Sequence, residues 1–351
     1  MVDRMQVIIK YTIDESVIAA YKYLSESEDI YSNPFLEYNW VLSMANAYDK
    51  NNIFILIKNK NKFIAACALR IDKQKFLMRE ITILRFINNN IADYNGIIYT
   101  KKEKASQIAK YFIRAINSIK NIDCIDLDNL QQNCHVSTEI LSQLRFNFKK
   151  YYIIPRSECP KLILDRSEID ILKKNKQDTL RCLKRLEENY SVEIFVNQKI
   201  EEKDLEVIMN IKEDTYGKHD LSIPQNFKIL LESIKNGIQY DYSYIKCNND
   251  IIAAHFGLSD NDTVYYYIPT FNRDFSKYAV GNILLLSLIE HYKNKNYKTF
   301  DFLRGGELYK KNWSSVTLKN QEALISLNKK GYIYITYIAL RRILSKVKQS
   351  D

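Results

Sequence analysis

The sequence predicts an α/β protein of two domains, each with a mixed central sheet flanked by helices. Three observations support this fold class. The chain has 351 residues, which is more than one small core needs and comfortable for two domains. Strand patterns come in pairs before helices and then alternate with them, which is typical of a mixed sheet covered by helices. The two halves also share their order of elements, without a close repeat of sequence.

The first half is predicted to form a domain over residues 1–155. Asn33-Pro34 is a helix-entry pattern, and the polar stretch at 59–62 between two apolar runs predicts a hairpin turn. The remaining elements follow from hydrophobic periodicity and the loops between them. The expected helices span 33–48, 102–119 and 135–146, and the expected strands span 52–58, 63–71, 79–87, 97–100, 124–130 and 148–155.

The second half is predicted to form a domain over residues 156–351. Two of the five prolines lie in 155–165, so this stretch is expected to be the crossover between the domains. Hairpin turns are expected at 248–249 and 260–262. The expected helices span 167–190, 201–216, 225–236, 281–296 and 331–348, and the expected strands span 191–196, 240–247, 250–259, 263–271, 298–304 and 322–328.

The charge of the chain favours anionic partners. The formal net charge is +10, which suits nucleic acid, acidic lipid or phosphorylated small molecules. The basic residues are spread along the chain rather than gathered in one tail, so nucleic acid is not favoured. A solvated surface rich in Lys is the simpler explanation.

The cysteines and histidines predict neither disulfides nor a metal site. The six cysteines include no CxxC pair and lie mostly in apolar surroundings, so we expect reduced, buried thiols in a cytoplasmic protein. The four histidines do not cluster with Cys or carboxylates at metal spacing.

The sequence predicts neither a signal peptide nor a membrane span. Its N-terminus lacks the apolar core of a signal peptide, and no apolar run approaches the ~20 residues that a span needs. We therefore expect no stable membrane insertion. Residues 331–348 are apolar and then basic, and this segment could cover the core, form a dimer or lie on a bilayer.

The stretch from 263 to 296 carries a candidate anion site. An expected strand ends near Pro269, and after a loop a buried helix starts at Gly281. A helix start offers free backbone N–H groups, and Gly lets a ligand approach the backbone. Arg273 and Lys277 add positive charge in the loop, so a pyrophosphate site is one interpretation and a tight strand-to-helix turn is the other. If strand 298–304 lies beside this strand but splays from it, the unpaired backbone could bind an amide-bearing ligand.

Two side chains are candidate bases. The sequence has no GxSxG, GxxxxGK or GxGxxG pattern. His255 lies within an apolar strand and could be a base facing the site or a satisfied core residue. Asp301 alternates with Phe300 and Phe302 on its strand, and an Asp there needs a partner if it is buried. Arg304 is the obvious partner, so Asp301 could be a base or part of a structural pair.

In this order and spacing the motifs resemble the BioF2-like (CelD-like) acyltransferases of the GNAT superfamily, relatives of the FemAB aminoacyl transferases. The resemblance covers nearly the whole chain. One departure is Ala279-Val280-Gly281, where the family often has Ser-Pro-Gly, so a possible hydroxyl contact is lost. The matching stretches are NPFLEYNW (33–40), IADYNGIIY (91–99), DTLRCLKRLEE (178–188), IIAAHFGL (251–258), YYYIPTFNRDFSKYAVGNILL (265–285) and FDFLRGGELYKKNW (300–313).

The resemblance implies two tandem GNAT-like domains, with an acyl-CoA site in the C-terminal one. Acyl-CoA would be a co-substrate, with no bound cofactor or metal. The implied activity is sugar N-acyltransfer: an acetyl or 3-hydroxybutanoyl group moves to the amine of a nucleotide-linked amino sugar. A dTDP-3-amino-3,6-dideoxyhexose is favoured, in the synthesis of surface polysaccharide such as lipopolysaccharide O-antigen or capsule.

The resemblance and the residue chemistry together nominate the site residues. In the catalytic set, Tyr309 would protonate the departing thiolate, unless it is a packed aromatic, and Lys310 would steady an oxyanion or bind a phosphate. Arg181 and Arg185 lie on one helix face and could hold acceptor phosphates or simply face solvent. The catalytic candidates are His255, Asp301, Tyr309 and Lys310; the cofactor-binding candidates are Tyr267, Ile268, Arg273, Lys277, Gly281, Asn282 and Arg304; and the substrate-binding candidates are Asp93, Tyr94, Arg181, Arg185, Tyr216 and His219.

Two other functions remain open at this point. A FemAB-type transferase that uses aminoacyl-tRNA fits the positive charge, although no long heptad insert is seen. A non-enzymatic binding module on a GNAT scaffold is less favoured, because the closing motif at 300–313 is intact. A monomer or a homodimer is expected.

Overall fold

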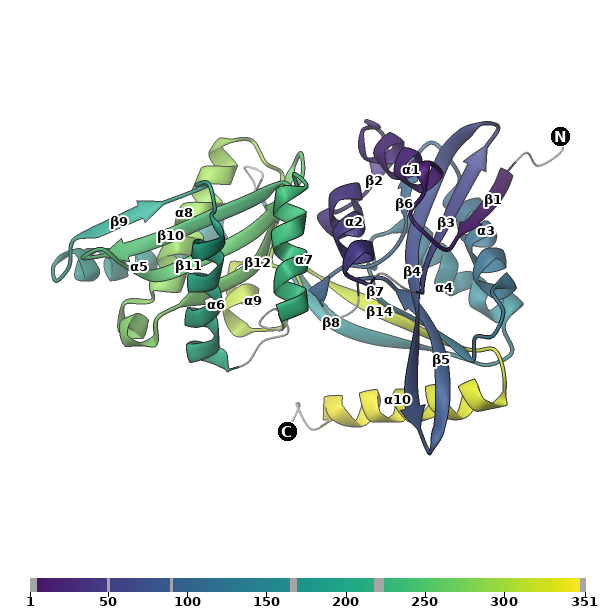
Figure 1. Cartoon of the computed structure of the whole chain (residues 1–351). Helices are drawn as coiled ribbons and strands as arrows, with labels where there is room; N and C mark the ends of the chain where they lie inside the picture. Colours follow the sequence, from purple (N-terminus) through teal and green to yellow (C-terminus); the bar gives the residue numbers. More distant parts are fainter. Residues whose placement is uncertain (1–4, 49–50, 89–90, 165–168, 218–223, 348–351) are drawn as a thin grey trace. The chain divides into compact units, whose positions relative to one another are not determined.

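The computed structural model describes residues 5–48, 51–88, 91–164, 169–217 and 224–347. The chain divides into two compact units (Figure 1), unit 1 with Met1–Ser157 and Lys319–Asp351 and unit 2 with Glu158–Leu318. The expected domains differ from these units after residue 318, because the C-terminal segment packs with unit 1. The reason is pairing: the last strand runs antiparallel beside β7 of unit 1 from Gln321 to Ser326.

Unit 1 is built on a mixed sheet. Within it β5 and β7 are parallel, whereas the pairs β1–β3, β3–β4, β4–β5 and β7–β14 are antiparallel. Short strands β2 (Ile30–Tyr31) and β6 (Ile98–Thr100) pair with each other, and β6 also pairs with β4. In sheet order the strands are β1 (Met5–Lys10), β3 (Asn52–Asn59), β4 (Lys62–Phe76), β5 (Arg79–Phe86), β7 (Cys124–Leu130), β14 (Val316–Ser326) and β8 (Tyr151–Ile163).

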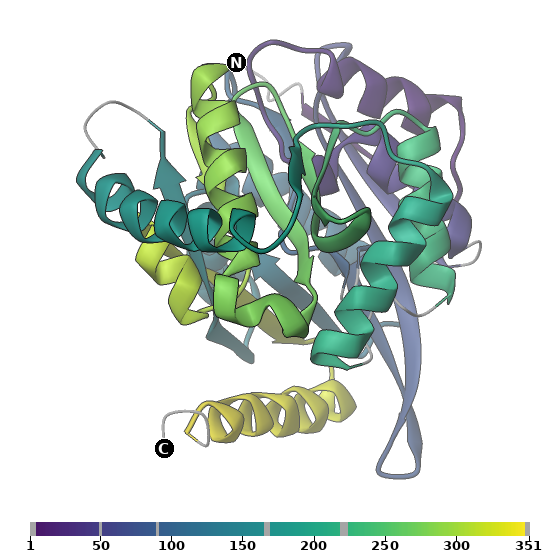
Figure 2. The same cartoon turned by 90° about the vertical axis from the view of Figure 1, so that its left-hand side faces the viewer.

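Helices cover both faces of this sheet. Helices α3 (Ala105–Ser118) and α4 (His135–Asn147) bury apolar side chains against one face, where Ile55 and Cys67 lie. Ala66 points to the opposite face, as strand alternation requires, beside α1 (Glu15–Ser25) and α2 (Tyr38–Ala47). Helix α10 (Lys329–Val347) packs against Ile81 and Leu324 through Ile335. The β4–β5 hairpin runs past α10, and its tip reaches beyond the helix in both views (Figures 1 and 2).

Unit 2 has a second mixed sheet. Its single parallel pair among the described strands is β12–β13, while β8–β13, β11–β12, β10–β11 and β9–β10 are antiparallel. The turn Asn248-Asn249 has positive φ at both residues, 49° and 79°, which confirms the expected tight hairpin. In sheet order the strands are β8, β13 (Thr299–Asp301), β12 (Thr263–Phe271), β11 (Asp250–Ser259), β10 (Tyr240–Cys247) and β9 (Val192–Phe195).

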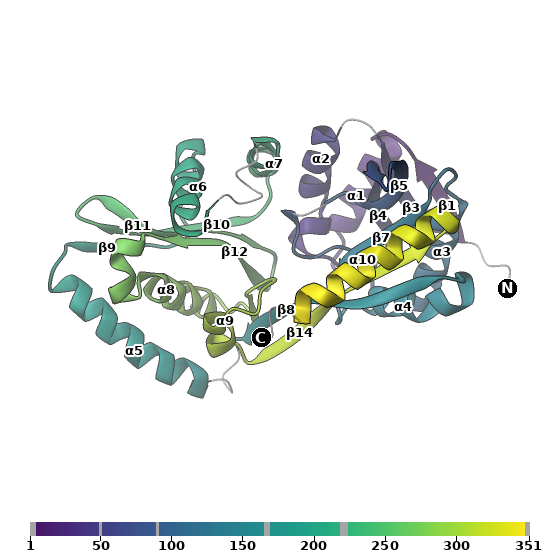
Figure 3. The ribbon, with the colours of Figure 1, turned by 90° about the horizontal axis from the view of Figure 1, so that it is seen from below.

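The helices of unit 2 also lie on both faces of its sheet (Figure 3). One face carries α6 (Glu202–Tyr216) and α7 (Pro224–Lys235); the other carries α5 (Ile169–Glu187), α8 (Val280–Asn294) and α9 (Leu308–Trp313). The apolar helix α8 fills the core through Leu284 and Leu288, against Ala253, Val264 and Phe300 of the strands. The predicted class, mixed sheets flanked by helices, is confirmed.

Several expected elements differ in detail. The crossover expected at 155–165 is part of strand β8. Proline lacks an N–H but keeps its carbonyl, and the Pro160 carbonyl accepts a hydrogen bond from Phe302 N at 3.0 Å. The helix expected at 33–48 is split into a 3₁₀ turn at Pro34–Leu36 and helix α2, because Glu37 is extended. The strand expected at 298–304 ends at Asp301, since Leu303 has φ 59°.

Sequence reasoning missed the first two elements, β1 and α1. Helix α1 had a readable start: the Asp14 side chain accepts hydrogen bonds from the backbone of Ser16 and Val17, as an N-cap does.

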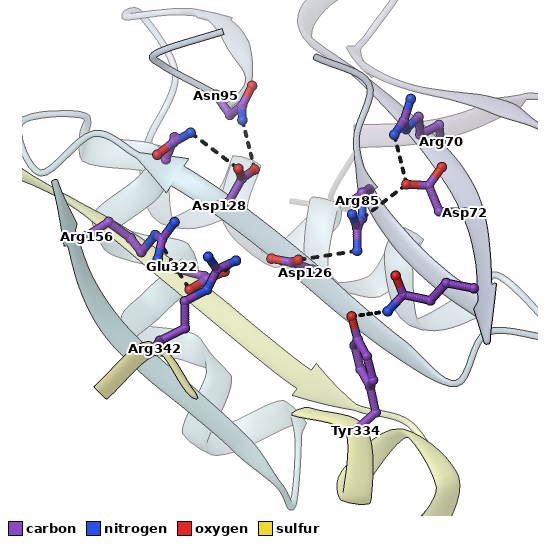
Figure 4. A network of polar contacts seen from close by, with 12 residues as sticks. Arg70, Asp72, Arg85, Asn95, Asp126, Asp128, Arg156, Glu322, Tyr334 and Arg342 are labelled. Carbon is purple, nitrogen blue, oxygen red and sulfur yellow. Dashed lines mark hydrogen bonds and ion pairs between the residues drawn. The ribbon is translucent and has the colours of Figure 1, made fainter. Parts of the chain in front are cut away.

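Unit 1 contains a buried network of charged side chains (Figure 4). Glu322 of β14 has a fully buried side chain between Arg156, at 3.7 Å, and Arg342, at 3.1 Å. Arg85 lies 3.5 Å from Asp126 on the neighbouring strand. Burial raises the pKa of Glu322 to about 7, and the charge of Asp126 adds to this, while the two arginines oppose it.

This network makes the stability of unit 1 depend on pH near neutrality. The folded pKa of Glu322 is raised from 4.5 to about 7, so the folded protein binds more protons than the unfolded chain between these values. Its free energy of unfolding should fall as pH rises through this window, by on the order of 2–3 kcal/mol at about 1.4 kcal/mol per pH unit. Urea unfolding across the window should show a flatter profile for Glu322→Gln. The exposed Glu80→Gln is the matched control, and equal slopes in all three proteins would contradict the role of Glu322.

Candidate active site

The predicted cofactor turn lies at a pocket of about 210 Å³ in unit 2. The pocket lies between the C-terminal half of β12 and the start of α8, and its lining is mainly apolar. It includes Gly281 and Asn282 from the predicted set, and Tyr309 from the closing motif. The lining residues are Ala254, Tyr266, Pro269, Thr270, Phe271, Ser276, Ala279, Val280, Gly281, Asn282, Leu284 and Tyr309.

The expected splay between two strands opens this pocket. β12 pairs with β13 only from Thr263 to Tyr265. Past that point, no described strand pairs with this edge of β12, because Phe302 N bonds instead to Pro160 of β8. The Thr270 hydroxyl is buried at the pocket and has no hydrogen-bond partner among the described residues. A ligand with amide groups could therefore bond to the open strand edge and to Thr270.

The start of α8 offers backbone N–H groups to an anion. Its N-cap is Ala279, which makes no side-chain cap hydrogen bond. Ala279 is in the left-handed region, with φ 51° and ψ 42°, which costs a non-Gly residue on the order of 1 kcal/mol or more. A Cβ on Gly281 would lie 3.5 Å from Phe271 Cδ1, an ordinary contact. The glycine is therefore not required by packing and instead leaves open space in the pocket.

The other predicted cofactor residues lie around this turn rather than in the pocket lining. Arg273 and Lys277 are exposed on the 3₁₀ segment Arg273–Tyr278, which runs directly into Ala279. The Ile268 side chain is fully buried and pairs with Phe256 in the ladder. Tyr267 is half-buried. Arg273 and Lys277 therefore supply positive charge near the helix start, and Ile268 offers a ligand only its backbone.

The closing motif forms a turn that carries Tyr309 to the pocket. The Asp301 side chain is fully buried, and its partner is Lys161 of β8, with Nζ 2.7 Å from Oδ2. Asp301 Oδ1 also accepts a hydrogen bond from Leu303 N at 2.9 Å. These contacts are those of a structural ion pair, although the sequence pointed to Arg304 as the partner. They stabilise the left-handed turn at Leu303 that precedes α9.

Lys310 secures the same turn from the other end. It is buried, its Nζ donates a hydrogen bond to the Arg304 carbonyl at 2.6 Å, and it lies 3.2 Å from Glu307 Oε2. Gly305 has φ 131°, and a Cβ there would lie 2.7 Å from Lys310 Nζ and 2.0 Å from Glu307 Oε2. Gly305, the first residue of the pair Gly305-Gly306, therefore leaves room for the hydrogen bond from Lys310 to the Arg304 carbonyl. Tyr309, next to Lys310 on α9, lines the pocket.

His255 is fully buried in a network behind the pocket. Its Nδ1 lies 3.1 Å from Asp241 Oδ1, and Asp241 also accepts hydrogen bonds from Ser243 at 2.8 Å and Tyr292 at 2.5 Å. The imidazole stacks on Tyr266, with ring centroids 4.5 Å apart. Tyr266 lines the pocket and His255 does not, so His255 is placed to orient Tyr266 rather than to contact a ligand.

A second pocket of about 170 Å³ meets the first at Ala279, Asn282 and Tyr309. Helix α5 supplies its polar wall, through residues other than the predicted Arg181 and Arg185. Asn175 and Thr179 are four residues apart and so lie on one helix face, a spacing that could have indicated them. The lining residues are Asn175, Asp178, Thr179, Cys182, Ala279, Asn282, Tyr309, Asn312 and Trp313.

The predicted substrate residues are not gathered at these pockets. Arg181 and Arg185 are exposed on α5; Arg181 lies 2.9 Å from Asp178, which lines the second pocket. Tyr216 is the last residue of α6, and His219 lies outside the described residues.

Asp93 and Tyr94 belong to unit 1 and are both buried there. The Tyr94 ring has no exposed surface and packs edge-on against Phe35, with centroids 6.5 Å apart. A side chain without exposed surface cannot contact a substrate in this conformation.

The described residues contain no group of three or more His, Cys, Asp or Glu side chains that could hold a metal ion. The six cysteines are free thiols, five of them buried. In the part of the chain that the structure describes, no helix is both long and apolar enough to span a bilayer.

Comparisons with known proteins bear on this site. Residues 173–311 match the family model of the acetyltransferase (GNAT) domain. This range holds the whole lining of the first pocket and all of the second except Asn312 and Trp313. A comparison with curated proteins found no match.

Solved structures share the fold at low sequence identity. FemX has 9% identity and a TM-score of 0.65, over 93% of this chain and 99% of that one. A conserved protein of unknown function from Bacteroides thetaiotaomicron has 11% identity and a TM-score of 0.57, over 92% and 100%. L-PGS from Bacillus licheniformis has 12% identity and a TM-score of 0.55, over 94% and 96%. These structures confirm the mixed α/β fold. The match of residues 173–311 to the acetyltransferase (GNAT) domain supports acyl transfer.

Proposed function

We propose that the protein is an acyl-CoA-dependent N-acyltransferase acting on the amine of a nucleotide-linked amino sugar. The observation that carries the acyl-CoA part is the apolar pocket at the splayed edge of β12, which opens onto the uncapped start of α8. The acceptor rests on the sequence resemblance alone. A dTDP-3-amino-3,6-dideoxyhexose is the favoured acceptor and acetyl or 3-hydroxybutanoyl the acyl group, for surface polysaccharide synthesis in the cytoplasm.

The pantetheine arm and the pyrophosphate of acyl-CoA need different surroundings, and residues at this pocket suit each of them. Its pantetheine arm is apolar with two amides, which suits Tyr266, Phe271 and Leu284 beside the open strand edge and Thr270. Its pyrophosphate suits the N–H groups at the start of α8. Arg273 and Lys277 supply positive charge beside them.

Acyl transfer needs a neutral amine, a stabilised tetrahedral intermediate and a protonated leaving thiolate. We assign the last step to Tyr309, whose hydroxyl would donate its proton to the sulfur as the carbon–sulfur bond breaks. The resulting phenolate would regain a proton, directly or through water, from the attacking nitrogen, which loses its second proton as the amide forms. Asp301 and Lys310 act as positioning residues, because they secure the turn that places Tyr309. The ammonium of the acceptor would lose its proton to water, and much of the rate would come from holding the two substrates together, worth up to about 7–11 kcal/mol.

A FemAB-type transferase that takes its acyl group from aminoacyl-tRNA is the second candidate. The shared fold with FemX and the net charge of +10 favour it. The apolar pocket favours acyl-CoA, because a tRNA-linked donor has no pantetheine arm to fill it. Activity that is lost after treatment with RNase would identify the tRNA-dependent reaction.

The test is release of free CoA, measured with a thiol reagent. Acetyl-CoA and 3-hydroxybutanoyl-CoA are each mixed with a panel of nucleotide-linked amino sugars. We expect thiol release that requires one acceptor, and a rise in the melting temperature of the protein with CoA alone.

Gly281→Val should lose the melting-temperature rise while the ligand-free protein stays as stable, because its side chain would enter the pocket. If no acceptor of the panel causes thiol release and CoA does not raise the melting temperature, the proposal is overturned. Stabilisation by CoA without release would retain the donor and reject the sugar acceptors tested.

A further inference from the structure

Helix α10 of unit 1 turns an apolar stripe toward solvent. One side of the helix is buried through Tyr334, Ile335 and Ala339. The side facing away carries large apolar residues at spacings of four, three and four, which lie on one helix face. A helix that covers a core normally presents polar side chains outward. This stripe consists of Ile333, Tyr337, Leu340 and Leu344, which are 56%, 47%, 56% and 63% exposed.

The tip of the β4–β5 hairpin adds two more exposed apolar side chains. Leu77 is 72% exposed and Met78 fully exposed. Both have positive φ, 46° and 62°, a conformation that usually selects Gly or Asn. Phe76 packs on Tyr337 of α10, with centroids 5.1 Å apart. The tip therefore lies beside the helix and extends past it on the side away from the sheet (Figures 1 and 2).

The surroundings of this apolar surface are basic. A groove of about 440 Å³ at the start of α10 is lined by Lys149, Lys150 and Lys329, with no carboxylate among its described lining residues. Ile333 of the stripe also lines the groove, so the groove and the stripe are continuous. Residues 327–347 include five basic residues and no Asp or Glu. On the hairpin, the exposed side chains of Lys75 and Arg79 flank the tip.

The acidic groups near this surface are already paired. Glu80 lies 2.8 Å from Lys73, Asp123 lies 2.6 Å from Lys330, and Glu322 lies 3.1 Å from Arg342. A second copy of α10 would bring the same basic residues against this one, with no acidic partner. A bilayer with anionic headgroups complements both features, because its headgroups match the basic residues and its acyl chains match the apolar stripe. Self-association complements only the stripe.

We propose that α10, the hairpin tip at Leu77-Met78 and the three-lysine groove form a docking surface for an anionic phospholipid bilayer. The apolar side chains would enter the boundary between headgroups and acyl chains, as interfacial helices do. The lysines would bind the lipid phosphates, each worth about 1 kcal/mol near an anionic surface. Binding is peripheral, since no described helix can span the bilayer.

Flotation of the full-length protein with vesicles tests this. Wild type should bind phosphatidylcholine vesicles that contain phosphatidylglycerol, bind phosphatidylcholine alone weakly, and be released by salt. Lys149→Gln/Lys150→Gln/Lys329→Gln should reduce the partition coefficient about 100-fold, as expected for the loss of three such contacts. Leu340→Ser/Leu344→Ser should reduce it about tenfold or more at unchanged charge.

Matched controls lie in unit 2. Lys235→Gln/Lys295→Gln/Lys298→Gln removes as many exposed lysines, and Leu308→Ser removes an exposed leucine. Both should bind like wild type, and circular dichroism checks that every variant is folded. Three results would overturn the proposal: no binding by wild type, equal binding to neutral vesicles, or equal losses in the control variants. A dimer in solution that Leu340→Ser/Leu344→Ser dissociates, without vesicle binding, would assign the stripe to self-association instead.

Discussion

Tyr309→Phe is expected to lower kcat by about 10²-fold, with little change in the affinity for acyl-CoA. Tyr309 lines both pockets at the point where they meet, and its hydroxyl is the proton donor that we assign to the leaving thiolate. A well-placed general acid contributes about 10²–10⁴ in rate. Phe keeps the ring and therefore the packing. The measurement is steady-state CoA release, with the melting temperature of the variant as a check on folding.

The control for this substitution is Tyr190→Phe, which removes a hydroxyl in unit 2 from an aromatic cluster with Phe275 and Tyr278. It should leave kcat unchanged. If Tyr309→Phe retained the wild-type kcat, the thiolate would take its proton from water. A rise in KM for acyl-CoA at constant kcat would instead make Tyr309 a binding residue.

Lys161→Met is expected to reduce the free energy of unfolding of unit 2 by roughly 3–5 kcal/mol, the usual cost of leaving a buried charge without its partner. Asp301 is fully buried, and Lys161 Nζ lies 2.7 Å from its carboxylate. Asp301 also accepts the hydrogen bond from Leu303 N that supports the turn before α9. The loss should therefore appear both in urea unfolding and as faster hydrogen exchange at β13.

Lys298→Met provides the comparison, because Lys298 forms an ion pair of similar length, 3.0 Å to Asp262, but is 76% exposed. Exposed pairs contribute about 0–1 kcal/mol. A similar small loss in both variants would show that Asp301 does not depend on Lys161. In that case Asp301 would again be a candidate base, and activity near neutral pH would be the next measurement.

Much of the fold could be read from local patterns. The apolar runs in 250–259 and 263–271 and the turn at Asn248-Asn249 are set by neighbouring residues, and these elements are confirmed. The strand at 155–163 was missed because two prolines argue locally against a strand. In the structure, the Pro160 carbonyl accepts a hydrogen bond from Phe302 N, which lies far away in the sequence. Proline therefore does not interrupt the pairing on this side of β8. Strand β14 was expected in the second domain, although it pairs with β7 of unit 1. Its partner is about 200 residues earlier in the chain, so no local pattern could show this pairing.

For the site, residue chemistry pointed to the correct segment but not to the contacts within it. Gly281 and Asn282 do line the pocket, because a helix start after a strand is a local feature. Asp301 had Arg304 as its expected partner, since only neighbours in sequence could be considered. The partner in the structure, Lys161, is 140 residues earlier on β8. Arg181 and Arg185 were expected at the site from α5, but the residues of this helix that line the second pocket are Asn175, Asp178, Thr179 and Cys182. Which face of α5 meets α9 is decided by tertiary packing.

The sequence by itself determined the fold class and the helix start near Gly281, because periodicity and the absence of a Cβ are properties of short segments. Only the tertiary structure decided which charged side chains are buried as pairs, which aromatic residues face a pocket and which face of α10 stays in solvent. Burial and pairing depend on segments that meet only when the chain has folded, and the free-energy cost of an unpaired buried charge is what selects the partner.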